Sequence, residues 1–584
     1  MEPAEDSFGL STRQKEVVAG DANFLLKACP GSGKTHTVAA RIARLMSDGA
    51  SIAACSYTNV GVAAVRNALA AQQQSVVEPR HFVGTLHGFL LRHVTYPFGH
   101  MTYGVTMRLL RDESSIWPTV DISDAASRRV ALPLFRMRPD GSMRLAQVPQ
   151  NVGLPESEVL RRGEGRARTL KRDMAARGWI SSDDAMYIAM RVLREHPDIT
   201  RAVAGRYDEL LVDEAQDTNE LQLECLRLLA TSGALRSLVL IGDPEQAISS
   251  YAGASAQGCD DLAKHCGLTT MSLTENYRSS QKICDLASYF SSQALPDTAV
   301  GRDAEHSVIP QFVVYPAEQP RRVVTTFIRR LEELGEDPQQ SAILLRSNAF
   351  RDEVSGFGES VRVLPRPLSF GRAVAKVRGA RTLDRRDVES IDRIVSQVAF
   401  DDEELTRRLP HERLAIRDAS IRFLTGAPSL KQDLQTWIRA SAALLTEIVQ
   451  ALVPQPARTG GSVLRTSASH AGHIAEAVFQ AAPSAFRAQT VHDVKGESRD
   501  AVLIVLDRQR GRSRGSRPAQ TTMWASRLRG EGGSPDDAEE VRIAFVALTR
   551  ARRYCLIAIP DDSSLQTVAA FADAGLDRLD VQWI

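Results

Sequence analysis

The stretch Asn23-Phe-Leu-Leu-Lys-Ala-Cys-Pro-Gly-Ser-Gly-Lys-Thr35 decides the fold of this chain. An apolar run from residue 24 to residue 28 predicts a short strand that breaks at Pro30. Gly31 and Gly33 then permit a tight curl of the backbone, and a helix starts at Thr35. Successive N–H groups converge at this helix N-terminus, where a phosphate is favoured. The stretch therefore predicts a strand, a phosphate-binding loop and a helix.

Two side chains of the loop are suited to a nucleoside triphosphate. Lys34 supplies a positive charge for the β- and γ-phosphates, and Thr35 supplies a hydroxyl for Mg²⁺. The usual pattern starts with glycine, whereas this chain has Ala28 at that position. The order of strand, turn, Gly-Lys-Thr and helix nevertheless favours a nucleotide site over an ordinary glycine-rich turn.

The composition is that of an ordinary soluble protein, with 584 residues, 43% hydrophobic residues, 24% charged residues and a formal net charge of +1. This length predicts several packed units rather than one core. No apolar run reaches transmembrane length, and the acidic start of the chain is unlike a signal peptide. The seven cysteines have no framework spacing, so we expect reduced thiols in a cytoplasmic protein.

Strand-like and helix-like segments alternate on both sides of two interruptions. Buried-type strands at 51–59 and 82–89 each lead into a helix, which is typical of a parallel, doubly wound α/β sheet. The stretch 93–182 is charged and rich in proline, so we interpret it as an insertion. A second β/α series begins near residue 310 and is interrupted by a helix-rich region at 376–482.

Two further apolar strands end in polar side chains that suit hydrolysis. The first delivers Asp213 and Glu214 side by side. Asp213 is placed to hold Mg²⁺, and Glu214 is placed to orient and deprotonate the attacking water. The second strand delivers Gln246, which is expected near the γ-phosphate.

Two arginines beside helices come from distant parts of the chain. A lone arginine on a helix is usually a surface residue. Arg278 and Arg550 in a long nucleotide hydrolase instead suggest fingers that neutralise transition-state charge across a cleft. The Arg/Gly/Ser run at 508–517 has two open interpretations: a loop near a phosphodiester backbone, or a solvated loop.

Taken in order, these segments resemble the UvrD/Rep/PcrA-type superfamily 1 DNA helicases. The matching segments are Gln14, Ala28–Thr35, Ser56–Asn59, Gly84–His87, Val212–Asp217, Gly242–Gln246, Asn276–Arg278, Thr490–Gly496 and Val546–Ala551. The resemblance covers most of the chain apart from the two interruptions. It implies two RecA-like P-loop NTPase domains, each carrying a mostly helical insertion.

The resemblance also implies a domain division. Domain 1A would comprise 1–92 and 183–290, with insertion 1B at 93–182. Domain 2A would comprise 291–375 and 483–584, with insertion 2B at 376–482. ATP would bind between 1A and 2A with Mg²⁺, and single-stranded or forked DNA would move past them in the 3′-to-5′ direction.

Further site residues follow from the matched segments. The expected ATP-binding residues are Gln14, Gly31, Ser32, Gly33, Lys34, Thr35, His36, Tyr277 and Glu497. The expected DNA-binding residues are Thr58, Asn59, His87, Tyr251 and His492. The expected catalytic residues are Lys34, Asp213, Glu214, Gln246, Arg278 and Arg550, with Thr35 and Asp213 as metal ligands.

Several positions depart from the family pattern. His36 stands where an arginine often packs on adenine, and Ser249 and Ala252 replace a tyrosine and an arginine. Only Tyr251 remains as an aromatic residue for base stacking there, which suggests a weaker grip on single strands, because stacking contributes about 1–3 kcal/mol per base. The carboxylate that meets the ribose is also in question, with Glu497 as the candidate.

The compact insertions and the Lys-Gly-Glu sequence of this chain are similar to those of the helicase subunit of Gabija antiphage systems. This narrower resemblance implies a defence role and a partner nuclease of the OLD family in a hetero-oligomer. Two function classes stay open: a motor that unwinds duplex DNA, and a DNA-stimulated ATPase that senses DNA ends or single strands and controls a partner. A nuclease activity of the chain itself is disfavoured, because no carboxylate cluster is left over for its metal.

Overall fold

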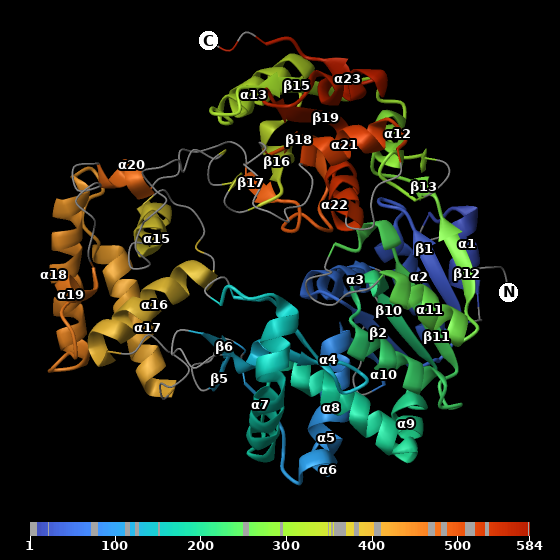
Figure 1. Cartoon of the computed structure of the whole chain (residues 1–584), viewed down its shortest axis with the longest axis horizontal. Coiled ribbons are helices and arrows are strands. Elements are labelled where there is room, and N and C mark those ends of the chain that lie inside the picture. Colours follow the sequence, from blue (N-terminus) through green and yellow to red (C-terminus); the bar gives the residue numbers. More distant parts are fainter. Residues whose placement is uncertain are drawn as a thin grey trace.

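The computed structural model describes most of the chain. The described residues are 9–20, 23–71, 80–110, 112, 117–122, 128–149, 152–248, 256–292, 296–347, 350–351, 354, 369–378, 383, 385–401, 410–464, 474–479, 487–507, 520–531, 537–581 and 583. Tyr251, Ser249, Ala252 and the 508–517 run lie outside these ranges. The fold is a mixed α/β architecture built on two parallel sheets (Figure 1).

The first sheet has six parallel strands in the order β12-β1-β11-β10-β2-β3. Its inner strands β1, β2, β10 and β11 are largely buried, as expected for a parallel sheet covered on both faces, whereas the edge strand β12 is mostly exposed. The six strands are β1 (Phe24–Ala28), β2 (Ile52–Ser56), β3 (Phe82–Thr85), β10 (Glu209–Asp213), β11 (Ser237–Gly242) and β12 (Thr269–Leu273).

Helices cover both faces of this sheet, and each face has its own core. One face packs against α1 (Thr12–Ala19), α2 (Lys34–Ser47) and α3 (Asn59–Ala71). The other packs against α4 (Leu86–Leu90), α8 (Ser182–Glu195), α9 (Pro197–Ala204), α10 (Glu220–Ala230) and α11 (Ala256–His265). Because the strands are parallel, their carboxyl ends lie at one edge, where the expected site residues follow β1, β10 and β11.

The second sheet also has six parallel strands, in the order β17-β16-β18-β19-β15-β20. The strands are β15 (Gln311–Tyr315), β16 (Ser341–Leu345), β17 (Arg487–Thr490), β18 (Arg499–Val505), β19 (Ala551–Pro560) and β20 (Asp577–Arg578). One face packs against α12 (Gln281–Ser288), α21 (Gln520–Leu528), α22 (Ala538–Leu548) and α23 (Leu565–Asp573), and the other against α13 (Arg322–Leu334). Figure 1 shows this sheet as a body separate from the first. The α/β class with parallel sheets, expected from the sequence, is confirmed.

The insertion after β3 differs from the expected mostly helical unit. It combines one long helix, α7 (Glu156–Ala176), with the antiparallel pairs β5–β6 (Thr119–Asp121, Arg129–Ala131) and β7–β8 (Phe135–Met137, Met143–Leu145). A parallel pair, β4–β9 (Arg108–Leu109, Trp179–Ile180), closes it. The expectation of a mostly helical insertion therefore missed these strands. The cause is local: the central residues Val120 and Val130 are buried between exposed neighbours, and three-residue strands are too short to leave a clear alternation in the sequence.

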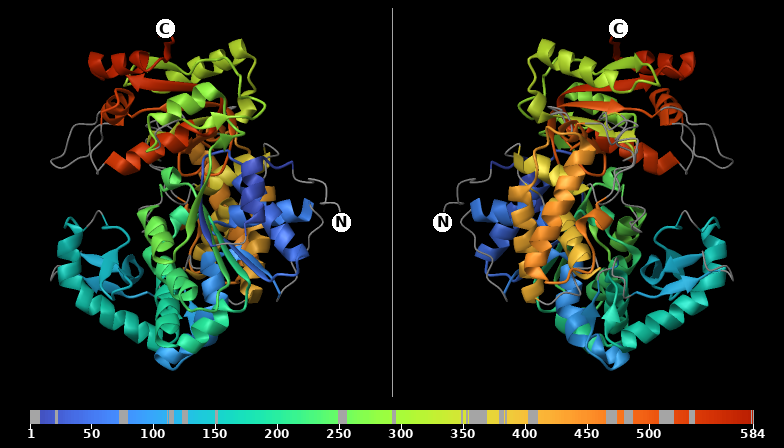
Figure 2. Two further views of the ribbon diagram at one scale, coloured as in Figure 1. Left: turned by 90° about the vertical axis from the view of Figure 1, so that its right-hand side faces the viewer. Right: turned by 90° about the vertical axis from the view of Figure 1, so that its left-hand side faces the viewer.

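The second insertion is helical. Its helices are α15 (Ser369–Arg378), α16 (Arg385–Phe400), α17 (Pro410–Gly426), α18 (Leu434–Leu452), α19 (Gly460–Val463) and α20 (Ala475–Phe479). They enclose a separate core around Trp437. Because α15 contributes to this core, the helical unit begins before residue 376. Figure 1 shows it at the left, with the first insertion between it and the first sheet, and Figure 2 shows the first insertion and the N-terminus on opposite sides of the molecule.

Across the described part of the chain, none of the helices combines the length and apolar character needed to cross a membrane.

Candidate nucleotide-binding site

The phosphate loop joins β1 to α2 through two glycines in the left-handed region. Gly31 has φ of 76° and Gly33 has φ of 75°, and α2 starts at Lys34. A Cβ atom on Gly31 would lie 2.5 Å from Cβ of Arg278 and 2.8 Å from Oδ1 of Asn276. Position 31 is therefore closed to any side chain both by conformation and by space.

Helix α1 supports the loop from behind. Nε2 of Gln14 donates to the carbonyl of Ser32 at 3.0 Å, while Oε1 of Gln14 accepts from the N–H of Ser11 at 3.0 Å. Oγ of Ser32 is buried and, within the described residues, has no hydrogen-bond partner. Such an unpaired buried hydroxyl in a cradle of positive-φ glycines fits a phosphate ligand.

The acidic pair stands at the end of β10. Asp213 is buried, and its Oδ1 accepts from the N–H of Glu214 at 3.0 Å. Glu214 itself has φ of 54°, an uncommon conformation for a residue with a side chain. Its Oε1 lies 3.8 Å from Nζ of Lys34, so the carboxylate and the loop lysine face each other.

The pKa values of Asp213 and Glu214 are shifted in opposite directions. Burial, with the neighbouring charge of Glu214, raises the pKa of Asp213 to about 7. Burial also favours the neutral form of Glu214, but the positive charges of Lys34 and Lys495 outweigh it and hold its pKa at about 2. Burial lowers the pKa of Lys34, whereas the carboxylates of Glu214, Asp243 and Asp213 raise it further, so the net direction is upward. Glu214 and Lys34 are therefore both charged at neutral pH.

Two glutamine side chains connect the carboxylates. Nε2 of Gln216 donates to Oε2 of Glu214 at 2.5 Å, and its Oε1 accepts from the N–H of Asp243 at 3.1 Å. Nε2 of Gln246 donates to Oδ2 of Asp243 at 2.6 Å. These contacts order the ends of β10 and β11 as one polar network, in which Gln216 was not expected from the sequence.

Arg550 reaches this network, and Arg278 lies beside it. Nη1 of Arg278 donates to the carbonyl of Thr549 at 2.9 Å. Arg550 is 1% exposed, and its Nη2 donates to Oε1 of Gln246 at 3.1 Å. Burial lowers the pKa of Arg278 to about 10 and that of Arg550 to about 9, and neighbouring arginine charges add to each shift. A concentration of buried positive charge thus faces the ends of the first sheet.

Lys495 is a site residue that the sequence reasoning missed. Its ammonium forms an ion pair with Asp217 and donates to the carbonyl of Gln246 at 2.8 Å. The lysine lies between His492 and Glu497, in a segment already matched to the helicase pattern. Its place in that segment was the signal that could have identified Lys495 as a site residue. Its partners could not be predicted from local sequence, because they are about 250–280 residues away.

The remaining expected ATP-binding residues lie around the loop. Thr35 is half-buried in the first turn of α2, and His36 next to it is exposed. Tyr277 is 40% exposed, and its N–H donates to the carbonyl of Gly31 at 2.9 Å. The Glu497 carboxylate pairs with Arg499, while its carbonyl accepts from Nη1 of Arg550 at 3.1 Å. Glu497 thus joins the site through its backbone.

The expected DNA-binding residues are more scattered. Oγ1 of Thr58 accepts from the N–H of Gly61 at 3.0 Å, and Asn59 is the first residue of α3. Nε2 of His87 lies 3.3 Å from Oγ of Ser182, beside a cavity of about 280 Å³ between the first sheet and its insertion. His492 follows β17, and burial together with Arg346 lowers its pKa. The position of Tyr251 lies outside the described residues.

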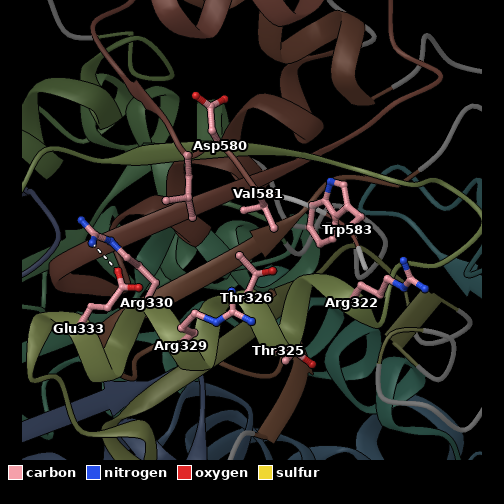
Figure 3. Close-up of a pocket in the computed structure, with 10 residues that line it drawn as sticks. Arg322, Thr325, Thr326, Arg329, Arg330, Glu333, Asp580, Val581 and Trp583 are labelled. Carbon is pink, nitrogen blue, oxygen red and sulfur yellow. Dashed lines mark hydrogen bonds and ion pairs between the residues drawn. The ribbon is translucent and has the colours of Figure 1, made fainter.

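A separate pocket lies along α13 in the second half. Its volume is about 390 Å³, and Arg322, Arg329, Arg330, Glu333, Asp580 and Trp583 are among its lining residues (Figure 3). Arg330 forms an ion pair with Glu333 at 2.8 Å, and Asp580 lies over the same face, so the charges of the pocket largely offset one another. It contains none of the expected site residues.

The acidic side chains described at the site do not form a metal-binding cluster. Among the described residues, no group of three or more His, Cys, Asp or Glu side chains is arranged to hold a metal ion. Mg²⁺ at a triphosphate site ordinarily takes only one or two protein ligands and completes its shell with phosphates and water. Thr35 and Asp213 fit that requirement.

Comparisons with known proteins agree with this geometry. Residues 10–267 match the family model described as the UvrD/REP helicase N-terminal domain. The chain is 27% identical over 363 residues to DNA helicase II of Escherichia coli (strain K12), which covers 58% of this chain and 48% of that protein. It is 26% identical over 302 residues to ATP-dependent DNA helicase UvrD1 of Mycobacterium leprae (48% and 39%), and 27% identical over 308 residues to ATP-dependent DNA helicase SRS2 of Saccharomyces cerevisiae (47% and 25%).

These matches relate the N-terminal half of the chain to the UvrD/REP helicase family. The chain spans about half the length, or less, of these curated relatives.

Proposed function

We propose that this protein is an ATP-dependent DNA helicase or translocase of the UvrD type. One observation carries the proposal: Lys34 and Glu214 at the first sheet lie in one polar network with Arg550 from the second half. Such an arrangement places a phosphate loop, a carboxylate and positively charged fingers around one site. The homology of residues 10–267 to helicases supports the same activity.

The two sheets would be RecA-like domains 1A and 2A, with the insertions as 1B and 2B. Supporting this division, each sheet has its own cores, and each insertion has a core of its own. The division departs from the ranges expected from the sequence at two places: α12 packs against the second sheet, so domain 1A would end before residue 281, and the helical unit starts at α15.

ATP would be held by the phosphate loop and Lys34, with Gln14 and Tyr277 beside it. Thr35 and Asp213 are the residues that would hold Mg²⁺, and the ion would supply charge neutralisation for the phosphate oxygens. Because burial and the charge of Glu214 raise the pKa of Asp213 to about 7, any proton on this carboxyl group must leave as the ion binds.

Glu214 is the proposed general base. Its pKa of about 2 keeps it ionised at neutral pH, and Gln216 fixes one of its oxygens at 2.5 Å. The side chain can therefore orient a water and accept its proton. When Lys34 turns from Glu214 to a phosphate, the carboxylate loses a positive neighbour and becomes a stronger base.

Arg278 and Arg550 would neutralise charge that develops on the phosphates. Gln246 contacts Asp243 at the end of the first sheet and Arg550 of the second half. It would therefore couple a movement of Arg550 to the end of the first sheet. Opening and closing of the two halves would then move DNA past Thr58, Asn59, His87, Tyr251 and His492. The 3′-to-5′ direction comes from family resemblance.

The test combines two measurements on the full chain. We expect ATP hydrolysis that rises with single-stranded DNA, and displacement of a strand from a forked duplex only when ATP and Mg²⁺ are present. Lys34→Ala should abolish both signals. Hydrolysis that ignores DNA would contradict the proposal.

A second candidate function is a DNA-stimulated ATPase that senses DNA ends or single strands and controls a partner, with little unwinding. The replacement of a tyrosine and an arginine by Ser249 and Ala252 favours it, because it removes stacking and charge from the strand path. DNA-stimulated hydrolysis without strand displacement would support this alternative over the motor.

The likeness to the helicase subunit of Gabija systems stays a prediction, and so do an OLD-family nuclease partner and a cytoplasmic location. The helicase relatives reported above add no support to a defence role. Finding an OLD-type nuclease encoded next to this protein, and co-purification of the two, would support it.

A further inference from the structure

The buried ion pair between Arg41 and Glu209 lies behind the nucleotide site rather than in it. Arg41 belongs to α2, two turns after Lys34, and is 1% exposed. Its Nε donates to Oε1 of Glu209 at 2.8 Å and its Nη2 donates to Oε2 at 2.6 Å. Glu209 is also buried and accepts a further hydrogen bond from Oγ of Ser237 at 3.0 Å. The guanidinium is therefore held in a fixed, bidentate geometry.

The remaining guanidinium nitrogen of Arg41, Nη1, caps the C-terminal end of α1. Nη1 of Arg41 donates to the carbonyl of Val17 at 2.9 Å and to that of Val18 at 3.4 Å, and it also donates to the carbonyl of Gly20. The last carbonyls of a helix have no partner within the helix, so a cation at this end both satisfies them and complements the helix dipole. Arg41 is thus the C-terminal anchor of α1.

Helix α1 needs such an anchor because it has only eight residues. An isolated helix of that length is marginal in water, so tertiary contacts decide where it lies. At its other end, Gln14 donates to the carbonyl of Ser32 in the phosphate loop. Nε2 of Gln14 also lies 2.8 Å from the position that a Cβ atom on Gly33 would take. A shift of α1 therefore moves Gln14 relative to the loop.

We propose that Arg41 and Glu209 are positioning residues for nucleotide binding, which act by holding Gln14 of α1 against the phosphate loop. The pair also ties α1 to the start of β10, the strand that ends at Asp213. One buried network thus sets the spacing between the loop and the acidic pair. This inference rests on the proposed nucleotide-binding function.

The informative variant is Arg41→Lys, which keeps the charge but loses the fork. We expect the Kd for a fluorescent ADP analogue and the KM for ATP to rise about tenfold, as for the loss of one charge-assisted hydrogen bond. The kcat at saturating ATP should change much less. Glu209→Gln, which keeps the shape and one acceptor, should shift both constants in the same direction.

A double-mutant cycle that combines Arg41→Lys with Gln14→Ala tests whether Arg41 affects nucleotide binding through Gln14. If Arg41 acts through Gln14, the double variant should weaken ADP binding little more than the more severe single variant does. If the rise in Kd for the double variant equalled the product of the rises for the two single variants, the inference would be overturned. A lower Tm for Arg41→Lys with an unchanged Kd would overturn it as well.

The control is Arg417→Lys. Within the helical insertion, Nε of Arg417 donates to Oδ1 of Asp392 at 3.2 Å and its Nη2 donates to Oδ2 at 2.7 Å, although this arginine is half exposed. It should leave the Kd for the ADP analogue unchanged, and an equal rise in that Kd would overturn the inference. If the parent protein bound no nucleotide, the proposed function would fail instead, and the two failures are thereby distinguished.

Discussion

Nη2 of Arg550 lies 3.1 Å from Oε1 of Gln246, although 304 positions separate the two residues in the sequence. Both side chains are buried, and each is held by further contacts, Arg550 by the carbonyls of Val546 and Glu497 and Gln246 by Asp243. An arginine from the second half thus meets a glutamine of the first half at the proposed site of hydrolysis. This relationship makes the role of Arg550 directly testable.

Arg550→Ala should lower kcat for ATP hydrolysis by about 1,000-fold or more, the usual effect of removing an arginine finger. Binding of an ADP analogue should change much less, because the arginine acts on charge that develops during hydrolysis. Steady-state ATPase rates and fluorescence titrations measure the two effects. Arg552→Ala, a nearby arginine that is paired with Asp500 at 3.5 Å, serves as the control and should cost far less. Similar kcat values for the two variants would remove Arg550 from this role.

Glu214→Gln should retain Mg²⁺-dependent ATP binding and lose turnover by about 100-fold or more, because the amide cannot accept a proton from water. Single-turnover hydrolysis and equilibrium binding separate the two properties. Glu220→Gln on α10 is a matched control that should hydrolyse ATP at the parental rate. Hydrolysis by Glu214→Gln at that same rate would exclude Glu214 as the base.

Gly31→Ala should abolish nucleotide binding. The added methyl would lie 2.5 Å from Cβ of Arg278 and would also have to adopt φ of 76°. Gly233→Ala is the control, since Gly233 has φ of 75° but no atom within 4 Å of its Cβ position. Both variants carry the conformational cost of about 1 kcal/mol or more, and only Gly31→Ala carries the steric clash. Loss of binding in both would show that backbone strain alone is responsible.

Asp297→Asn should reduce the pH dependence of stability. Burial, with the charge of Asp243, raises the pKa of Asp297 to about 7 from an ordinary value of 3.8. The folded state therefore binds the proton more tightly than the unfolded state does, and the stabilisation is lost as the pH rises from about 4 through 7. The variant should have a higher Tm than the parent at pH 8, and the difference should shrink toward pH 5.

Asp140→Asn is the control, because the pKa of Asp140 is shifted downward, opposite to that of Asp297. Hydrogen bonds from Ser142 lower the pKa of Asp140, so its contribution to stability is present at neutral pH and is lost as the pH falls. Its removal should not raise the Tm at pH 8. Parallel melting curves for Asp297→Asn and the parent between pH 5 and pH 8 would contradict the assigned shift.

Much of the candidate site followed from local sequence, because the functional side chains stand directly after buried strands. Asp213 and Glu214 end β10, and Gln246 closely follows β11. Carboxyl ends of parallel strands meet at one edge, so predicting the strands also predicted that these residues gather. Arg278 and Arg550 were expected as fingers because they stand beside helices in distant parts of the chain; Arg550 contacts Gln246, and Arg278 contacts the neighbouring carbonyl of Thr549.

The missed features depend on contacts that no local pattern contains. Lys495 meets Asp217 across 278 positions, and Gln216 was overlooked because its neighbours Glu214 and Asp217 carry the charges. The strands of the first insertion are two or three residues long, below the length at which alternation is recognisable. The carboxylate of Glu497 pairs with Arg499, an interaction that the sequence-based ribose assignment did not anticipate.

The chain crosses from the first sheet to the second half beside the phosphate loop. The carbonyl of Leu273 accepts from the N–H of Cys29 at 2.9 Å, and the N–H of Tyr277 donates to Gly31 at 2.9 Å. The crossing strand is thereby pinned to the loop just before Arg278. If the second half rotates as a rigid body, its pivot lies beside the phosphate loop, where we propose that the nucleotide binds. Atoms near Arg278 then travel the shortest arc, and the outlying helical insertion sweeps the longest, so a small chemical displacement becomes a large mechanical stroke.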